Sequence, residues 1–202
     1  MLKREMTKSE IEKDLQGKGD YVQIDNLRRF LKENLAIDTR KFVLMKLVLI
    51  YENRKMFSEA ADLYGKLSEL AMNASERSSF LIKQIEDYIK SGFFDMVDLI
   101  MGKLMSETVK YTDKAKITST IIGFYVTQAQ IYEKEKRRSK AVEIYEKLLT
   151  MKIPDSDRTE IKNRLLKLYY ALGMVDKYMN LKESSSKLTQ KQGSRSSDEF
   201  KI

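Results

Sequence analysis

A seventeen-residue stretch occurs twice in this chain, and this repetition constrains the fold more than any other feature. Residues 51–67 read YENRKMFSEAADLYGKL and residues 132–148 read YEKEKRRSKAVEIYEKL, with eight of the seventeen positions identical. A weaker copy, YIKSGFFDMVDLIMGKL, occupies residues 88–104. Internal similarity at a period of about 20–50 residues is typical of arrays in which each unit packs on the next. The sequence therefore predicts a row of repeated units.

Apolar residues in and around the first copy recur every three or four positions, which is the period of an amphipathic helix. They are Leu44, Leu47, Val48, Tyr51, Ala60, Leu63, Tyr64 and Leu67. One proline and eight glycines in 202 residues leave few positions at which a helix must end. We expect an all-α protein of about nine to ten helices. An N-terminal helix is expected from Thr7, a second over 21–36, and Ser58 is expected to cap a later one.

The composition argues against most enzyme chemistry. The chain has no cysteine and no histidine, so it has no disulfide, no thiol nucleophile and no histidine base or metal ligand. It also has no phosphate-binding glycine loop and no nucleophile elbow. Acidic residues fall at expected helix starts or on solvated faces. We expect a protein that is not an enzyme and that uses no cofactor and no metal.

The sequence shows no segment of the kind that crosses a membrane. The longest apolar run, residues 42–51, is interrupted by Lys46 and is shorter than the roughly 20 residues that a spanning helix needs. The first residues are charged and lack the apolar segment of a secretory signal. These features and the lack of cysteine favour a cytoplasmic location.

The repeated stretch resembles the tetratricopeptide repeat (TPR), a helix–turn–helix unit of about 34 residues. That family has a tyrosine in the first helix, glycine in the turn and a small residue in the second helix. The tyrosine position holds Tyr51, Tyr88, Tyr132 and Tyr169. The turn position holds Lys55, Gly92, Lys136 and Gly173. The small-residue position holds Ala60, Val97, Ala141 and, in a degraded fourth unit, Tyr178.

The resemblance implies a TPR-like α-solenoid, a right-handed superhelix of antiparallel helix pairs, in a single domain over residues 1–183. The implied units are about 41–73, 76–109, 113–150 and 157–183, with a degenerate cap at about 7–36 and a disordered tail at 184–202. Irregular spacing also resembles the TPR-like solenoids of vesicle-fusion adaptor proteins. An unrelated all-α bundle is the alternative interpretation.

The spacing between the repeat tyrosines departs from that of the family. Tyr51, Tyr88, Tyr132 and Tyr169 are separated by 37, 44 and 37 residues. The larger middle spacing adds about two helical turns at roughly 3.6 residues each. We therefore expect a long helix from about 114 to 135 that extends beyond its neighbours.

The resemblance also implies that a partner peptide or helix binds in a groove lined by the first helix of each unit. The groove positions are Phe42, Met45, Leu49, Ile82, Glu86, Val126, Gln130, Asn163 and Lys167. They grade from apolar to polar, which suits an amphipathic helix or an extended segment. Met45 and Leu49 replace the lysine and asparagine of chaperone-binding members, so a clamp for a terminal carboxylate is not expected. Alternatively, Phe42, Met45 and Leu49 pack against the 21–36 helix as core.

A basic turn between two expected helices is a second candidate surface. It contains Lys134, Lys136, Arg137, Arg138 and Lys140, in a chain of net charge +8. Clustered cations attract RNA and other polyanions. Glu133 and Glu135 interleave with them and no aromatic platform is adjacent, so a solvated turn is the other interpretation.

Overall fold

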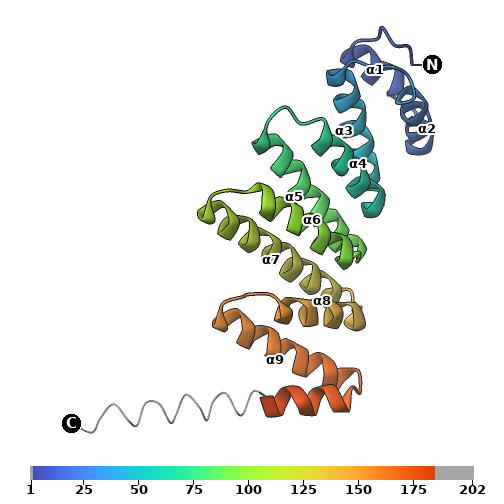
Figure 1. Cartoon of the computed structure of the whole chain (residues 1–202). Coiled ribbons are helices and arrows are strands. Elements are labelled where there is room, and N and C mark those ends of the chain that lie inside the picture. The colour runs from blue at the N-terminus through green and yellow to red at the C-terminus, as the bar shows by residue number, and fades with distance from the viewer. Residues whose placement is uncertain (1, 185–202) are drawn as a thin grey trace. The chain divides into compact units, whose positions relative to one another are not determined.

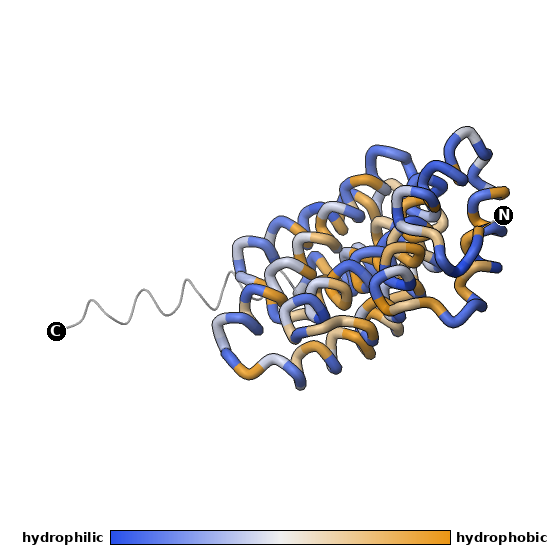
Figure 2. Tube along the Cα trace, turned by 90° about the horizontal axis from the view of Figure 1, so that it is seen from above, coloured by the Kyte–Doolittle hydropathy of each residue, from blue (hydrophilic) through white to orange (hydrophobic). Residues whose placement is uncertain are grey.

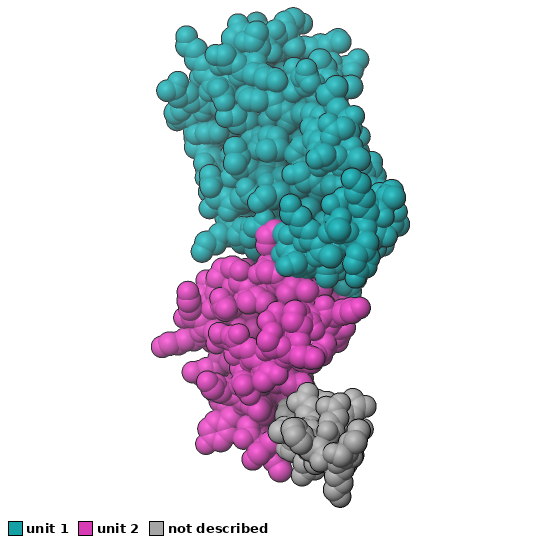
Figure 3. Space-filling model, turned by 90° about the vertical axis from the view of Figure 1, so that its left-hand side faces the viewer, with its two compact units in different colours: residues 1–121 teal, residues 122–202 magenta. Residues whose placement is uncertain are grey.

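The computed structural model describes residues 2–184, and these residues form helices joined by short turns (Figure 1). No strand occurs in this part of the chain, which confirms the all-α class. Residue 1 and residues 185–202 lie outside it, and with them almost all of the tail predicted at 184–202. The chain divides into two compact units, residues 1–121 and 122–202 (Figure 3).

The first unit holds six helices and the beginning of a seventh. They are α1 (Lys8–Leu15), α2 (Asp20–Phe30), α3 (Ile37–Asn53), α4 (Phe57–Glu69), α5 (Ala74–Ser91), α6 (Phe94–Glu107) and the start of α7 (Tyr111–Lys134). The second unit holds the rest of α7, then α8 (Arg138–Thr150), α9 (Asp155–Ala171) and a helical segment at 175–184. The prediction of nine to ten helices is confirmed over the described residues.

The N-terminal helices differ in part from the sequence expectation. The Glu10 N–H donates to the Thr7 hydroxyl at 3.3 Å and the Glu10 carboxylate accepts the Thr7 N–H at 2.7 Å, so α1 begins with a capping box. The prediction of a helix reaching residue 36 is wrong, because α2 ends at Phe30. The Arg40 guanidinium donates to the carbonyls of Leu31 at 3.4 Å and Glu33 at 3.1 Å, and these bonds hold the chain in a turn.

The amphipathic stripes of the first repeat form the core of the first unit. Apolar and polar residues alternate in short stretches along the helices (Figure 2). All eight residues of the predicted stripe are buried: Leu44, Leu47, Val48, Tyr51, Ala60, Leu63, Tyr64 and Leu67. α4 packs against both α3 and α5, and α5 packs against α6. The small side chain of Ala60, fully buried, leaves room for this close packing.

Four turns of the chain share one backbone geometry. Each has a residue of left-handed conformation at the predicted turn position: Lys55 (φ 59°), Gly92 (84°), Lys136 (59°) and Gly173 (67°). The residue that follows each of them donates its N–H to the carbonyl of the repeat tyrosine. These bonds join Met56 to Tyr51 (2.8 Å), Phe93 to Tyr88 (3.0 Å), Arg137 to Tyr132 (2.8 Å) and Met174 to Tyr169 (2.9 Å). The pattern is the Schellman helix ending, repeated four times.

This turn also fixes where the second helix of each pair begins. α4 starts at Phe57 with Met56 as its N-cap, so the prediction that Ser58 caps this helix is wrong. The Ser58 hydroxyl instead donates to the Glu59 carboxylate at 2.8 Å. The predicted long helix is confirmed: α7 has 24 residues, compared with 17 in α3 and 18 in α5.

Candidate binding surfaces

The aromatic residues of the second helices form equivalent hydrogen bonds inside two repeats. The Tyr64 hydroxyl donates to Glu52 Oε1 at 3.1 Å, and the Tyr145 hydroxyl donates to Glu133 Oε1 at 2.5 Å. Burial, together with the neighbouring glutamate, raises the pKa of both phenols above the ordinary value. They therefore remain protonated donors, and each pair joins the two helices of its own repeat.

The repeat tyrosines make bonds to a preceding helix. The Tyr88 hydroxyl donates to Asp62 Oδ1 at 2.6 Å, and the Tyr169 hydroxyl donates to Glu146 Oε1 at 2.7 Å. Burial and the adjacent carboxylate raise the pKa of Tyr88 to about 12. These two side chains pack one helix pair against another.

Asp87 on α5 is the most perturbed acidic group of the first unit. Its side chain is 1% exposed, its Oδ1 accepts from Lys90 Nζ at 3.0 Å, and its Oδ2 has no hydrogen-bond partner. Burial raises the pKa of Asp87 to about 6, and the nearby Glu52 and Glu86 act in the same direction. Asp87 lines none of the three cavities described below. Its setting is that of a buried structural charge.

The first unit contains a cavity of about 670 Å³ between α5, the turn after α6 and the start of α7. Ile82, Val109 and Ile117 supply its apolar lining. Serine and threonine hydroxyls and charges of both signs surround this lining: Ser75, Ser78, Ser79, Thr108, Thr120, Lys83, Lys110, Lys116, Glu107 and Asp113. A cavity of this size and mixed lining can hold one or two side chains of a peptide. It contains one predicted groove residue, Ile82.

The other groove residues predicted in the first unit have different surroundings. Phe42 and Met45 are half-buried and pack against the N-terminal core cluster, as the core interpretation expects. Leu49 is 49% exposed. Glu86 is half-buried and pairs with Lys83 at 2.8 Å and with Lys90 at 2.9 Å. Within this unit, Ile82 and Leu49 are therefore the predicted apolar positions that a ligand could reach.

The second unit contains a charged cavity of about 560 Å³ that brings the two predicted sets of residues together. Asn163 and Lys167, predicted for the groove, line it with Arg138 from the basic turn. Its other charged lining residues are Glu133, Glu160 and Arg164. Leu168 and Ala171 complete the cavity.

The charges of this cavity fall into paired and unpaired groups. Arg164 donates to Glu160 at 2.9 and 3.0 Å and to Glu133 at 3.3 Å. Within residues 2–184, the side chains of Arg138, Asn163 and Lys167 make no hydrogen bond or ion pair. The cavity therefore offers two cations and one amide to an incoming acidic group.

The remaining predicted positions of the second unit lie outside this cavity. Val126 and Gln130 are half-buried on α7. Lys134, Lys136 and Lys140 are exposed. The Arg137 guanidinium stacks on the Tyr132 ring at 4.5 Å and pairs with Glu135 at 3.3 Å. The basic turn thus divides between exposed lysines, an arginine occupied by its neighbours and Arg138 in the cavity.

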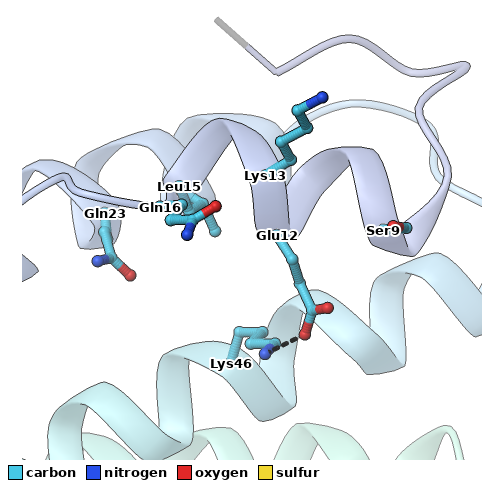
Figure 4. Close-up of a pocket in the computed structure, with 7 residues that line it drawn as sticks. All are labelled: Ser9, Glu12, Lys13, Leu15, Gln16, Gln23 and Lys46. Carbon is cyan, nitrogen blue, oxygen red and sulfur yellow. Dashed lines mark ion pairs between the residues drawn. The ribbon is translucent and has the colours of Figure 1, made fainter.

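A third cavity, of about 450 Å³, lies among α1, α2 and α3 (Figure 4). Glu12 reaches from α1 to an ion pair with Lys46 on α3, whereas Lys13 points away from that pair (Figure 4). Gln23 Nε2 donates to the Lys18 carbonyl at 2.6 Å. Because its central charges are paired internally, this cavity is a weaker candidate than the other two.

Sequence reasoning missed the arginines that precede three of the repeats, one before each. Arg158 donates to the carbonyls of Leu149 at 2.9 Å and Met151 at 3.0 Å, in the same spacing that Arg40 uses on Leu31 and Glu33. The corresponding Arg77 pairs with Glu107 at 3.0 Å. The signal was present, because Arg40, Arg77 and Arg158 each stand eleven residues before a repeat tyrosine.

Comparison with known proteins does not assign the chain to a family. No protein-family model matches it, and a search of curated proteins gives no significant match. In the described part of the chain no group of three or more acidic residues could hold a metal ion. None of the helices between residues 2 and 184 combines the length and hydropathy needed to cross a membrane.

Proposed function

We propose that this chain is a TPR-like helical repeat protein that acts as a non-enzymatic adaptor. It binds a peptide or a helical segment of a partner protein in the cytoplasm. The repeated left-handed turns at Lys55, Gly92, Lys136 and Gly173 support the repeat assignment, because an accidental helical bundle has no reason to use one turn four times. The matching Tyr64–Glu52 and Tyr145–Glu133 bonds support it independently.

The proposed binding function rests on one observation: residues that the repeat pattern predicts for the groove line cavities of the structure. Ile82 lines the cavity of the first unit, and Asn163 and Lys167 line that of the second. These positions were chosen from the repeat pattern alone, whereas the repeat tyrosines are buried. A division between buried frame positions and accessible groove positions is the arrangement a peptide-binding repeat requires.

The linings of the cavities suggest the chemistry of the partner. Ile82, Val109 and Ile117 suit an apolar side chain, which gains free energy on leaving water. Arg138, Lys167 and Asn163 suit a carboxylate. A partner with an apolar side chain suits the first cavity and a partner with an acidic side chain suits the second, and an amphipathic helix carries residues of both kinds.

The exposed Lys134, Lys136 and Lys140 favour a second candidate function, binding of RNA or another polyanion. The same measurement separates the two. Partner capture at physiological salt that survives nuclease treatment supports the adaptor function. Binding that disappears after nuclease treatment, or that collapses between low and moderate salt, supports the polyanion function instead.

Site-specific photo-crosslinking tests the adaptor function most directly. A photoreactive amino acid placed at position 82 or 163 should become covalently joined to one partner, whereas the same amino acid at the exposed Lys66 of α4 should not. With the photoreactive amino acid at position 163, Lys167→Glu should remove the crosslink and Lys66→Glu should not. Equal crosslinking at position 66, or none at 82 and 163, would refute the proposed binding surface.

A further inference from the structure

α6 exposes apolar side chains where the equivalent helices expose charged ones. α4, α6 and α8 each follow the left-handed residue of a repeat turn, so their positions can be compared directly. The position four residues after the left-handed residue holds Glu59 in α4, Met96 in α6 and Lys140 in α8. The position seven residues after it holds Asp62 in α4, Leu99 in α6 and Glu143 in α8. All six are exposed. Leu99 has an exposed fraction of 67%.

The exposed face of α6 is centred on Leu99. The opposite side of the helix is buried through Val97, Ile100 and Leu104. On the exposed side, Leu99 is flanked at helical spacing by Asp95, Met96, Gly102 and Lys103. A Cβ added at Gly102 would meet no atom within 4 Å, so the surface there is open. None of these residues lines a cavity.

The residues of this face are spaced equally on either side of Leu99. Asp95 and Lys103 lie four residues before and after it, and Met96 and Gly102 lie three residues before and after it. Within the described residues, the side chains of Asp95 and Lys103 have no ion-pair partner. A face with a cation at one end, an anion at the other and an apolar centre is complementary to itself when one copy is turned end over end.

We propose that this face is a self-association surface, on which a second copy of the chain packs its own α6 antiparallel with the two-fold axis at Leu99. Asp95 then lies beside Lys103 of the second copy, and Met96 lies beside the open position at Gly102. A parallel arrangement places like charges together, which opposes it. None of the residues of this surface lines a cavity of the proposed function.

One helix from each copy makes a small interface. Stable complexes bury roughly 1,200–2,000 Å² in total, and smaller interfaces are typical of weak association. We therefore expect a concentration-dependent dimer with a dissociation constant on the order of micromolar. Two rim ion pairs set the direction of packing, and Leu99 and Met96 supply the apolar contact.

Sedimentation velocity of the full chain over a range of concentrations tests the proposal. The wild-type chain should pass from monomer to dimer, and Leu99→Asp should remain a monomer over the same range. Val175→Asp is the matched control, because Val175 is an exposed apolar residue of another helix and its change should leave the dimer intact. Circular dichroism should show that each variant keeps its helical melting curve. A chain that is monomeric at every concentration would overturn the proposal.

Charge reversal tests the antiparallel direction. Asp95→Lys and Lys103→Asp should each weaken the dimer by about tenfold, because every change replaces two attractive pairs with two repulsive ones. The double variant should restore most of the loss. A dimer that Leu99→Asp abolishes but that neither reversal weakens would contradict this geometry.

A single introduced cysteine tests the position of the two-fold axis, because the chain has none of its own. Packed helices about 8–10 Å apart, each with a Cα radius near 2.3 Å, leave about 3.4–5.4 Å between Cα atoms on the axis. The upper part of this range suits a disulfide, which joins Cα atoms about 4.4–6.8 Å apart. Leu99→Cys should form a covalent dimer under mild oxidation, and Val175→Cys should not. Equal crosslinking of both variants would refute the assigned axis.

Discussion

The two most similar repeats, α3–α4 and the α7–α8 pair, are built alike but meet different neighbours. Both use a lysine in the left-handed turn, Lys55 or Lys136, and both join their helices through a tyrosine and a glutamate. The two repeats differ in the charged residue that lies next to this glutamate. Glu52 is near the buried Asp87, another negative charge, whereas Glu133 is bonded to the cation Arg164.

This difference separates a structural role from a proposed binding role. In the first unit the additional acid is buried on α5, with Lys90 of the same helix beside it. In the second unit the additional cation lies in an open cavity with the unpaired Arg138 and Lys167. The same frame therefore supports a buried charge in one place and a candidate ligand site in another, according to what the next helix supplies.

The largest effects should come from buried leucines at the same place in the two repeats. Leu67 and Leu148 are both fully buried. Leu67→Ala and Leu148→Ala should each lower the free energy of unfolding by about 2–5 kcal/mol, through lost burial and the cavity left behind. Urea unfolding measures both, with Val175→Ala at an exposed apolar position outside the α6 surface as a control expected to change little. A much smaller loss for Leu148→Ala would show that the two repeats are not packed equivalently.

Removal of the buried acid should change how stability depends on pH. The pKa of Asp87 rises from 3.8 to about 6 on folding, so the folded state holds this proton more tightly than the unfolded state does. The contribution of this group to stability is present at low pH and falls as the pH rises from about 4 to 6. Asp87→Asn removes this dependence.

The advantage of Asp87→Asn over the wild-type chain should therefore increase by about 2–3 kcal/mol between pH 4 and pH 7. Chemical unfolding at a series of pH values measures this change. The comparison isolates Asp87, because Glu76 and Glu86, whose pKa values are lowered, are present in both proteins. An unchanged difference across that range would contradict the assignment.

Loss of the tyrosine hydroxyl should cost the first repeat more than the second. Tyr64→Phe removes the donor from Glu52, which is then left near Asp87, so we expect a loss of about 2 kcal/mol. Tyr145→Phe should cost about 1 kcal/mol, because Glu133 keeps its bond to Arg164. Thermal unfolding compares the two variants. Equal losses would indicate that the neighbouring charge has no influence on these bonds.

The smallest expected effect concerns the turns, where the two repeats should agree. Lys55→Gly and Lys136→Gly should each stabilise the fold by about 0.5–1 kcal/mol, because glycine takes a positive φ without the steric cost that lysine has. Gly92→Ala should destabilise it, since Gly92 has φ 84°. Thermal unfolding of the three variants tests this, and a destabilised Lys55→Gly would show that the lysine side chain supports the turn.

Much of the fold was predictable because it is repeated. The positions of Tyr51, Tyr132, Ala60 and Ala141 recur at fixed spacing, and all four are buried. The end of α2 was not predictable from local sequence, because it depends on hydrogen bonds from Arg40 further along the chain. Local propensity carries no information about such tertiary bonds.

The candidate sites were only partly predictable for a similar reason. Repeat numbering identified Ile82, Asn163 and Lys167, which line cavities, but it could not show that Phe42 and Met45 pack against the core cluster of the first unit. It also treated Arg138 as part of a separate basic surface, although folding brings this residue to the cavity of Asn163 and Lys167.

The position of Arg138 implies that the two candidate ligands, an acidic protein segment and a polyanion, would compete for the same residue. It belongs to the run of cations at residues 134–140, yet its side chain lines the cavity that an acidic segment would occupy. A carboxylate held there would neutralise one of the charges that a polyanion would use, and a polyanion bound to Arg138 would take this residue from the carboxylate. Each ligand would displace the other in a competition experiment, so the partner protein and any nucleic acid would act as mutually exclusive occupants of one arginine.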